Sequence, residues 1–227
     1  MIASFLCFNR PDLAQSMIEQ LQGLSVAVLD NGSEPPLAEQ LHKGFEDEAF
    51  RIWRCSPNRQ FSGGWNYFMF VMRNVDYVLM ANDDITGISP AIVRNLVDAL
   101  EADETLAAVS PVVPESPWRG THSLRRGMRD LPFIDWLAPM MRVSAWNDVG
   151  GFDEQFAGYG ADLDLCARLV QKGWKLAVNG DVVVHHPTPG ATRISTGTSE
   201  AFTGHGWHDR LVAKWGKPSH VLAEQGP

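Results

Sequence analysis

The sequence predicts an α/β fold in which helices cover both faces of a mostly parallel central sheet. Short apolar runs alternate with amphipathic segments through the first half of the chain, a pattern typical of strand–helix–strand crossovers. Polar, turn-forming clusters stand directly after two of these runs, at Asp30 and at 82–84. Ligands bind at the carboxyl ends of parallel strands, so these clusters mark a candidate site.

The first half of the chain divides into predicted strands joined by helices. Pro11 and Pro90 each stand where a helix begins, a position that proline favours, and Gly63 and Gly64 lead into a further helix. We predict strands over 2–8, 26–29, 50–55, 77–81 and 107–113, and helices from 11 onward and over 37–43, 63–73 and 90–101.

The second half begins with a segment over 114–132 that is rich in Pro, Gly, Ser and Arg, which predicts a long surface loop. Its arginines, Arg119, Arg125, Arg126 and Arg129, either solvate the loop or form a lid that clamps an anion. We predict an ordered stretch over 136–142, a short helix before Gly150, a helix over 162–172, strands over 175–178 and 182–185, and a helix over 207–215 in a Gly-, Thr- and Ser-rich tail.

Composition excludes several classes of protein. The 227 residues are 44% hydrophobic, which fits one domain with a sizeable core. A net charge of -8 argues against binding to nucleic acid or to anionic membranes. The three widely spaced cysteines favour a reducing compartment over a disulfide framework. With neither a signal-like N-terminus nor a long apolar stretch, we expect a soluble, cytoplasmic protein.

Two pairs of carboxylates are candidates for metal binding or for general-base catalysis. Asp83 and Asp84 follow a predicted strand beside Asn82, and such oxygen ligands suit Mg²⁺ or Mn²⁺; a polar turn would also use these residues. Asp162 and Asp164 stand in the first turn of a predicted helix. There they either complement the helix dipole or supply a general base.

Six short motifs, in order, resemble those of the family-2 glycosyltransferases with the GT-A fold, in particular a rhamnosyltransferase-like branch. The resemblance covers about 1–190 and implies a Rossmann-like nucleotide-diphospho-sugar transferase fold. The motifs are FNRP, LDNGS, NRQFSGGWN, MANDDI, GGFDEQF followed by GYGADLDLCARL, and VVVHH.

The resemblance implies a binding site for a UDP- or dTDP-linked sugar and its metal ion. Mn²⁺ or Mg²⁺ would be held by Asp84 and by His185, which we favour over His186, while Asp30 would accept a hydrogen bond from uracil or thymine. Gly63 and Gly64 would leave helix amides free for a phosphate or sugar group. The remaining expected donor-site residues are Asn9, Arg10, Asn58, Asn66, Asn82 and Asp83.

The resemblance also implies an inverting hexosyl transfer to a hydroxyl of a glycan, a lipid-linked sugar or another acceptor, in bacterial-type glycan synthesis. Asp162 would be the general base and Asp164 a supporting residue. Ala161 stands where the family has Glu, which leaves open a catalytically inactive sugar- or nucleotide-binding protein. A nucleotidyltransferase is the third alternative, although the loop after the first predicted strand lacks glycine.

We expect a single domain over 1–227. A nucleotide-sugar-binding half over 1–113 is followed by a mobile loop over 114–132. An acceptor-binding and catalytic half covers 133–190, and a tail covers 191–227.

Overall fold

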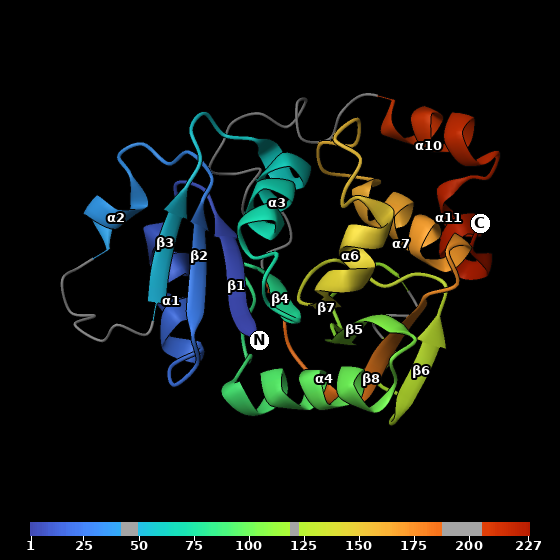
Figure 1. Ribbon diagram of the computed structural model, residues 1–227, viewed down its shortest axis with the longest axis horizontal. Coiled ribbons are helices and arrows are strands. Elements are labelled where there is room, and N and C mark those ends of the chain that lie inside the picture. Colours follow the sequence, from blue (N-terminus) through green and yellow to red (C-terminus); the bar gives the residue numbers. More distant parts are fainter. Residues whose placement is uncertain (42–49, 119–122, 188–205) are drawn as a thin grey trace.

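The protein is built around one eight-stranded sheet with the strand order β3-β2-β1-β4-β7-β5-β8-β6 (Figure 1). The computed structural model describes residues 1–41, 50–118, 123–187 and 206–227. The strands are β1 (Ile2–Cys7), β2 (Val26–Asp30), β3 (Phe50–Arg54), β4 (Tyr77–Asn82), β5 (Leu106–Val112), β6 (Met128–Leu131), β7 (Met140–Arg142) and β8 (Lys175–Val183). The helices are α1 (Pro11–Gln20), α2 (Leu37–Gln40), α3 (Gln60–Val71), α4 (Pro90–Ala102), α6 (Val143–Val149), α7 (Ala161–Gln171), α10 (Trp207–Trp215) and α11 (Ser219–Gln225).

Strand direction places several loop segments at one edge of the sheet. β1 is parallel to β2 and β4, and β2 is parallel to β3. β7 is antiparallel to both β4 and β5, so β4 and β5 point the same way, and β8 is parallel to β5. The residues that follow β1, β2, β4, β5 and β8 therefore meet at a common edge, and the predicted mostly parallel α/β sheet is confirmed.

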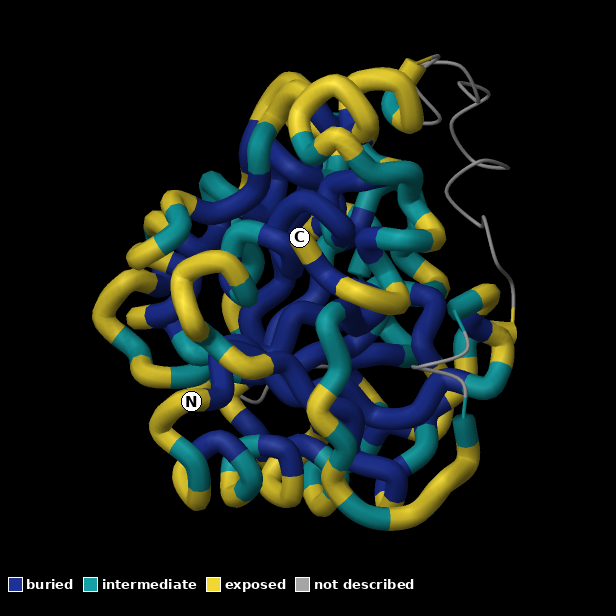
Figure 2. Tube along the Cα trace, turned by 90° about the vertical axis from the view of Figure 1, so that its right-hand side faces the viewer, coloured by how far each residue is buried: buried dark blue, intermediate teal, exposed yellow. Residues whose placement is uncertain are grey.

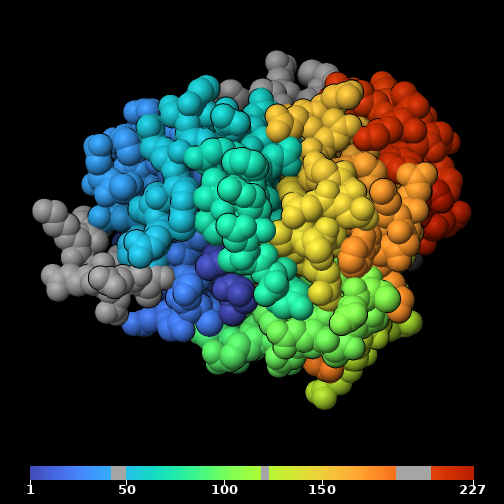
Figure 3. Space-filling view, viewed as in Figure 1, coloured from blue at the N-terminus to red at the C-terminus, as the bar shows by residue number. Residues whose placement is uncertain are grey.

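Two buried apolar layers hold the helices against the sheet. One layer joins α3, α6, α7, α10 and α11 to one face, with Trp65, Phe68, Trp146 and Phe152 among its large side chains. The other joins α1 and α4 to the opposite face. Buried chain runs through the centre and exposed residues lie on the outer helices (Figure 2). The two ends of the chain lie on opposite sides of one body, with the N-terminal segments (blue) at the left and the C-terminal segments (red) at the right (Figure 3).

Local sequence explains where the helices begin and end. Pro11 and Pro90 occupy the first turns of α1 and α4, where a missing backbone N–H costs no hydrogen bond. Ser89 accepts a hydrogen bond from the Ile92 amide as the N-cap of α4. Gly160 precedes α7 with φ of 85°, a conformation that disfavours residues with a side chain.

The structure corrects the predicted elements in the second half. β8 is one strand where two were predicted; Gly180 lies inside it, and a side chain there would collide with the backbone oxygen of Arg125. β6 lies within the predicted 114–132 loop as an edge strand that pairs with β8, and its MRDL sequence carries little apolar signal. α11 was not predicted. In the described parts of the chain, no helix combines the length and apolar character needed to cross a bilayer.

Candidate active site

Asp84 and His186 form the centre of the candidate site. Asp84 lies in the turn after β4, is 7% exposed, and its Oδ1 is 2.9 Å from Nε2 of His186. The neighbouring His185 points elsewhere: its side chain is 52% exposed and its Nδ1 is 2.9 Å from Oε1 of Glu115. Successive residues of an extended chain point to opposite sides. The structure therefore corrects the preference for His185, since it is the His186 imidazole that faces Asp84.

The charges around His186 favour a cation. Burial by itself lowers the pKa of this imidazole, but the hydrogen bond to Asp84 and the negative charges of Asp84, Asp135 and Glu115 outweigh it and raise the pKa. A carboxylate oxygen and an imidazole nitrogen are both ligands of Mn²⁺. Within the described ranges, no three His, Cys, Asp or Glu side chains are grouped to bind a metal by themselves. The Asp84–His186 pair therefore suits an ion that completes its coordination with substrate oxygens and water.

Asp83 points toward the end of β1 rather than toward His186. Its carboxyl group interacts with the Cys7 thiol and with the charge of Arg10, and burial together with the charge of Asp84 raises the pKa of Asp83 to about 7. Arg10 pairs with Asp12, its Nη2 2.9 Å from Oδ2. Asp83 and Arg10 thus lie close together. Asn82 is half-buried at the end of β4, and its backbone N–H donates to the Leu137 carbonyl oxygen.

Asp162 lies at the start of α7, and a second carboxylate, that of Asp135, interacts with it. Burial raises the pKa of Asp162, although its Oδ1 accepts a hydrogen bond from the Leu163 amide. Asp135 is 5% exposed and accepts a hydrogen bond from the Ser116 hydroxyl. Burial and the charge of Asp162 raise the pKa of Asp135, and the charge of His186 opposes that rise.

Asp135 was not among the site residues predicted from the sequence. The available signal was an acidic residue inside the apolar stretch FIDW, where a charge is costly unless it has partners. Through Asp135 the structure brings the predicted base and the predicted metal ligand Asp84 into one cluster, because Asp135 interacts with both Asp162 and His186.

Asp164 has other partners than this cluster, and its expected supporting role stays a prediction. It is fully buried, with Oδ2 2.8 Å from Nε of Arg168 and Oδ1 2.7 Å from Nζ of Lys214. The indole N–H of Trp215 also donates to it at 3.0 Å. Residues two apart on a helix point in different directions, so Asp164 ties α7 to α10 while Asp162 remains beside Asp135.

The side chain of Asp30 also binds other groups of the protein. Its side chain is 1% exposed, Oδ1 and Oδ2 accept hydrogen bonds from the amides of Ser33 and Leu37, and Arg54 Nε lies 3.4 Å away. The carboxylate thus holds the loop that follows β2, and its expected hydrogen bond to a nucleobase stays a prediction. Asn9 supports the same loop, because its backbone N–H donates to Ser33 and its side-chain oxygen accepts from the Glu34 amide.

The start of α3 differs from the expected phosphate site. α3 begins at Gln60, three residues before Gly63. The amide of Gln60 donates to Asn58, and the amides of Phe61 and Ser62 donate to the Ala157 carbonyl, so these amides are not free. Gly64 serves packing, since a Cβ there would lie 2.7 Å from Cδ1 of Leu6.

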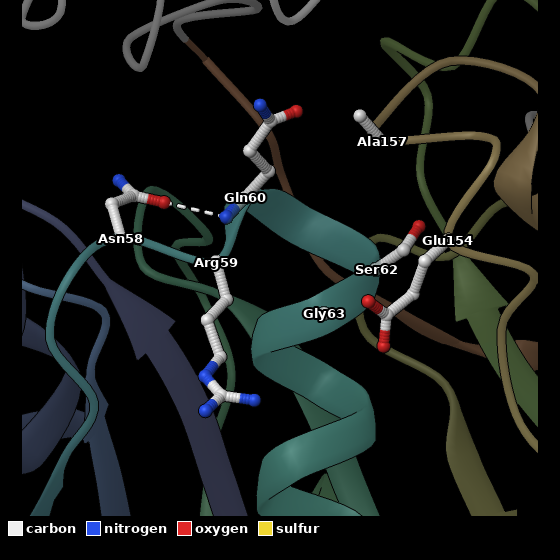
Figure 4. A pocket seen from close by; sticks show the side chains of 7 residues that line it. All are labelled: Asn58, Arg59, Gln60, Ser62, Gly63, Glu154 and Ala157. Carbon is white, nitrogen blue, oxygen red and sulfur yellow. Dashed lines mark hydrogen bonds between the residues drawn. The ribbon is translucent and has the colours of Figure 1, made fainter.

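A cavity of about 230 Å³ lies beside this helix start and brings Asn58 and Gly63 together with Glu154 (Figure 4). Glu154 faces Gly63 and its Oε1 accepts a hydrogen bond from Asn66. Asn66 also exchanges hydrogen bonds with the backbone of Phe152, so its amide is used within the protein. The lining residues are Asn58, Arg59, Gln60, Ser62, Gly63, Glu154 and Ala157.

Two arginines of the 114–132 segment are exposed, and two tryptophans that follow this segment are buried. Arg125 and Arg126 are exposed, and Arg119 lies outside the described residues. Trp136 and Trp146 are buried against Phe152, so their rings pack in the core.

Comparison with known proteins supports a glycosyltransferase class. No protein-family model matches the chain. Over 193 residues it is 27% identical to the pre-mycofactocin glycosyltransferase of Mycobacterium tuberculosis, which covers 78% of this chain and 40% of that protein. It is 34% identical over 84 residues to the N-acetylglucosaminyl-diphospho-decaprenol L-rhamnosyltransferase of the same organism, covering 35% of this chain and 27% of that protein. The chain thus spans less than half the length of these curated relatives.

Two solved structures share the fold. The mannosyltransferase PcManGT from Pyrobaculum calidifontis, in complex with GDP-Man and Mn²⁺, gives a TM-score of 0.68 at 18% identity and covers 98% of this chain and 66% of that one. GalNAc-T7 with UDP, GalNAc and Mn²⁺ gives a TM-score of 0.62 at 10% identity and covers 82% of this chain and 43% of that one. The chain has the GT-A glycosyltransferase fold, and its predicted resemblance to glycosyltransferases is confirmed.

Proposed function

We propose that this chain is a glycosyltransferase domain that transfers a hexosyl group from a nucleoside-diphosphate sugar to an acceptor hydroxyl, with inversion and with a divalent cation. The observation that carries the proposal is the Asp84–His186 pair at 2.9 Å after β4 and β8, with the half-buried Asp162 at the start of α7 and Asp135 interacting electrostatically with both His186 and Asp162. The similarity to curated glycosyltransferases and the nucleotide-bound, Mn²⁺-bound structural neighbours support it.

Asp84 and His186 would hold the cation, Mn²⁺ or Mg²⁺. When bound, the cation neutralises the charge that develops on the departing diphosphate and orients it. The imidazole of His186 favours Mn²⁺, because nitrogen ligands suit it better than Mg²⁺. Neighbouring Asp83 and Arg10 would line the nucleotide side of the same edge, and Asn82 would help to shape it.

Asp162 would act as the general base. The acceptor oxygen forms a bond to the anomeric carbon as the bond to the diphosphate oxygen breaks, and the hydroxyl proton passes to the Asp162 carboxylate. Burial raises the pKa of Asp162, which makes this carboxylate a stronger base, provided that it is ionised. Ala161 is buried at the start of α7, so the acid that the family has there is replaced by a packing residue.

The donor is proposed only as a nucleoside-diphosphate sugar. UDP or dTDP was expected because Asp30 would bind uracil or thymine. The Asp30 side chain is buried, so it gives no reason to prefer one nucleobase. The structural neighbours carry UDP in one case and GDP-Man in the other. The acceptor is proposed as a glycan, a lipid-linked sugar or another hydroxyl compound. Residues 1–113 would serve mainly the donor, and 133–190 the acceptor and the catalytic step.

A panel of nucleotide sugars tests the proposal. The full chain is incubated with UDP-, dTDP- and GDP-linked sugars, with and without Mn²⁺, and release of nucleoside diphosphate is measured. We expect release that requires the cation and is lost in Asp84→Asn and Asp162→Asn. Binding of a nucleotide sugar without release or transfer would instead indicate an inactive binding protein. A product that keeps the donor's anomeric configuration would overturn inversion.

A further inference from the structure

The segment that follows β5 contacts the backbone around His186. Glu115 uses both of its carboxylate oxygens: Oε1 lies 2.9 Å from Nδ1 of His185, and Oε2 accepts a hydrogen bond of 3.2 Å from the backbone N–H of His186. One carboxylate thus binds two successive residues, and the second of them presents its ring to Asp84.

The same two residues lie just beyond the regular sheet. β8 ends at Val183, so ladder hydrogen bonds no longer fix the chain at 185–186. Instead, the backbone of His185 exchanges two hydrogen bonds of 2.8 Å with Thr86. Thr86 stands two residues after Asp84, so this bridge connects the turn that carries Asp84 to the segment that carries His186.

Glu115 adds the second connection. The Thr86 bridge fixes the backbone of His185, whereas the Glu115 carboxylate fixes the amide of His186 and the orientation of the His185 ring. Without Glu115 the peptide between the two histidines would keep one of these attachments and lose the other. The direction of the His186 side chain depends on that peptide.

We propose that Glu115 is a positioning residue that holds the His186 imidazole in place for the cation, with His185 as its partner rather than as a ligand. This inference rests on the proposed cation site at Asp84 and His186. Glu115 itself does not face the ion; it acts through the backbone of His186 and through His185.

The expected effect follows from the behaviour of groups that orient metal ligands. Loss of such a group typically weakens metal binding about 10- to 100-fold. Because Glu115 holds the backbone and the neighbouring ring rather than the ring of His186 itself, we expect the lower end, about tenfold.

A titration of the full chain with Mn²⁺ alone measures this effect without any turnover. The EPR signal of the unbound ion reports how much Mn²⁺ is bound. We expect Glu115→Ala to weaken Mn²⁺ binding about tenfold and His186→Ala to weaken it by about 100-fold or more. Glu104→Ala is the matched control, because Glu104 is exposed near the opposite end of β5. It should leave Mn²⁺ binding unchanged.

Two further variants separate positioning from general destabilisation. Glutamine at 115 offers one oxygen acceptor in place of two, so Glu115→Gln should bind Mn²⁺ with an intermediate affinity. His185→Ala should weaken binding less than Glu115→Ala, and the double variant should resemble Glu115→Ala because the two residues act together. In the metal-free chain, Glu115→Ala should also shift the ring ¹⁵N resonances of His186 while the thermal transition stays cooperative.

The outcomes distinguish the inference from the function on which it rests. If His186→Ala loses Mn²⁺ but Glu115→Ala binds it like the unmodified chain, the role of Glu115 is overturned and the cation site stands. If the unmodified chain binds no Mn²⁺, or if His186→Ala binds it normally, the cation site is overturned and the positioning role with it.

Discussion

Asp162 and Asp164 stand two residues apart on α7, and replacing each by Asn should produce opposite results. Asp164 has no exposed side-chain surface and lies 2.8 Å from Arg168 and 2.7 Å from Lys214. Asn at this position would leave Arg168 without this carboxylate, while Lys214 would keep its pairing with Asp153 at 2.7 Å. Asp162 interacts with the Asp135 carboxylate instead, and Asn there removes a half-buried negative charge.

The magnitudes follow from burial. Removing one partner of a buried ion pair costs about 3 to 5 kcal/mol. Lys214 is 34% exposed, so solvent screens part of its interaction, and we expect about 3 kcal/mol for Asp164→Asn. For a chain of this size that lowers the melting temperature by roughly 6 to 12 °C. Turnover of the folded variant should remain near that of the unmodified chain.

Asp162→Asn should leave the fold at least as stable at neutral pH and remove activity. A carboxyl group whose pKa is raised on folding binds more protons in the folded state, so its ionisation reduces stability as the pH rises through that interval. Asn avoids this loss. Without the base, kcat should fall about 10²- to 10⁴-fold.

Thermal unfolding by circular dichroism gives the stability of both variants, and nucleoside diphosphate release below both transitions gives kcat. The reasoning is refuted if Asp164→Asn keeps the melting temperature of the unmodified chain and loses turnover. It is equally refuted if Asp162→Asn retains normal kcat.

Further outcomes are expected from the same geometry. Asp84→Asn should abolish Mn²⁺-dependent turnover while leaving the melting temperature unchanged, and full activity in excess chelator would contradict the cation site. Asp30→Ala should lower the free energy of unfolding in urea by about 2 to 3 kcal/mol, because hydrogen bonds to a charged group are lost; unchanged stability with weaker nucleotide binding by calorimetry would restore its expected role at the nucleobase. Gly64→Ala should destabilise the fold by about 1 to 3 kcal/mol, since its Cβ would meet Leu6 at 2.7 Å, and an unaltered melting temperature would show that α3 can shift without cost. Because burial raises the pKa of Asp162, kcat/KM should fall on acidification at a pH well above the ordinary carboxyl value of about 4; a pH profile that is flat down to that value would remove Asp162 as the base.

Patterns within a few residues predicted much of the fold. Apolar runs and helix-starting prolines act locally, so β1, β2, β4 and α4 lie close to where the sequence indicated them. β6 was missed because pairing with β8, far along the chain, stabilises a strand that has little apolar character of its own. Two strands were predicted in place of β8 because Asn179, Gly180 and Asp181 interrupt its apolar run. In the structure the strand continues through them, and Gly180 allows the close approach of Arg125.

The candidate site divides in the same way. The residue types at Asp84 and Asp162 and their places after a strand and before a helix could be read from the sequence. The choice between His185 and His186 could not, because it depends on where the chain turns after β8 and on the contact with Glu115.

The sequence by itself determined the α/β class, the resemblance to family-2 glycosyltransferases and the strand-end position of the carboxylates, since each is written in neighbouring residues. Only the tertiary structure decided which polar side chains bind other residues of the protein and which lie in the candidate site. Asp30 and Asp164 look like site residues in a linear reading, but distant partners enclose them. Asp135 looks like part of an apolar stretch, but folding brings it beside Asp162 and His186. The reason is physical: burial and charge act through space, between residues that only the folded chain places together.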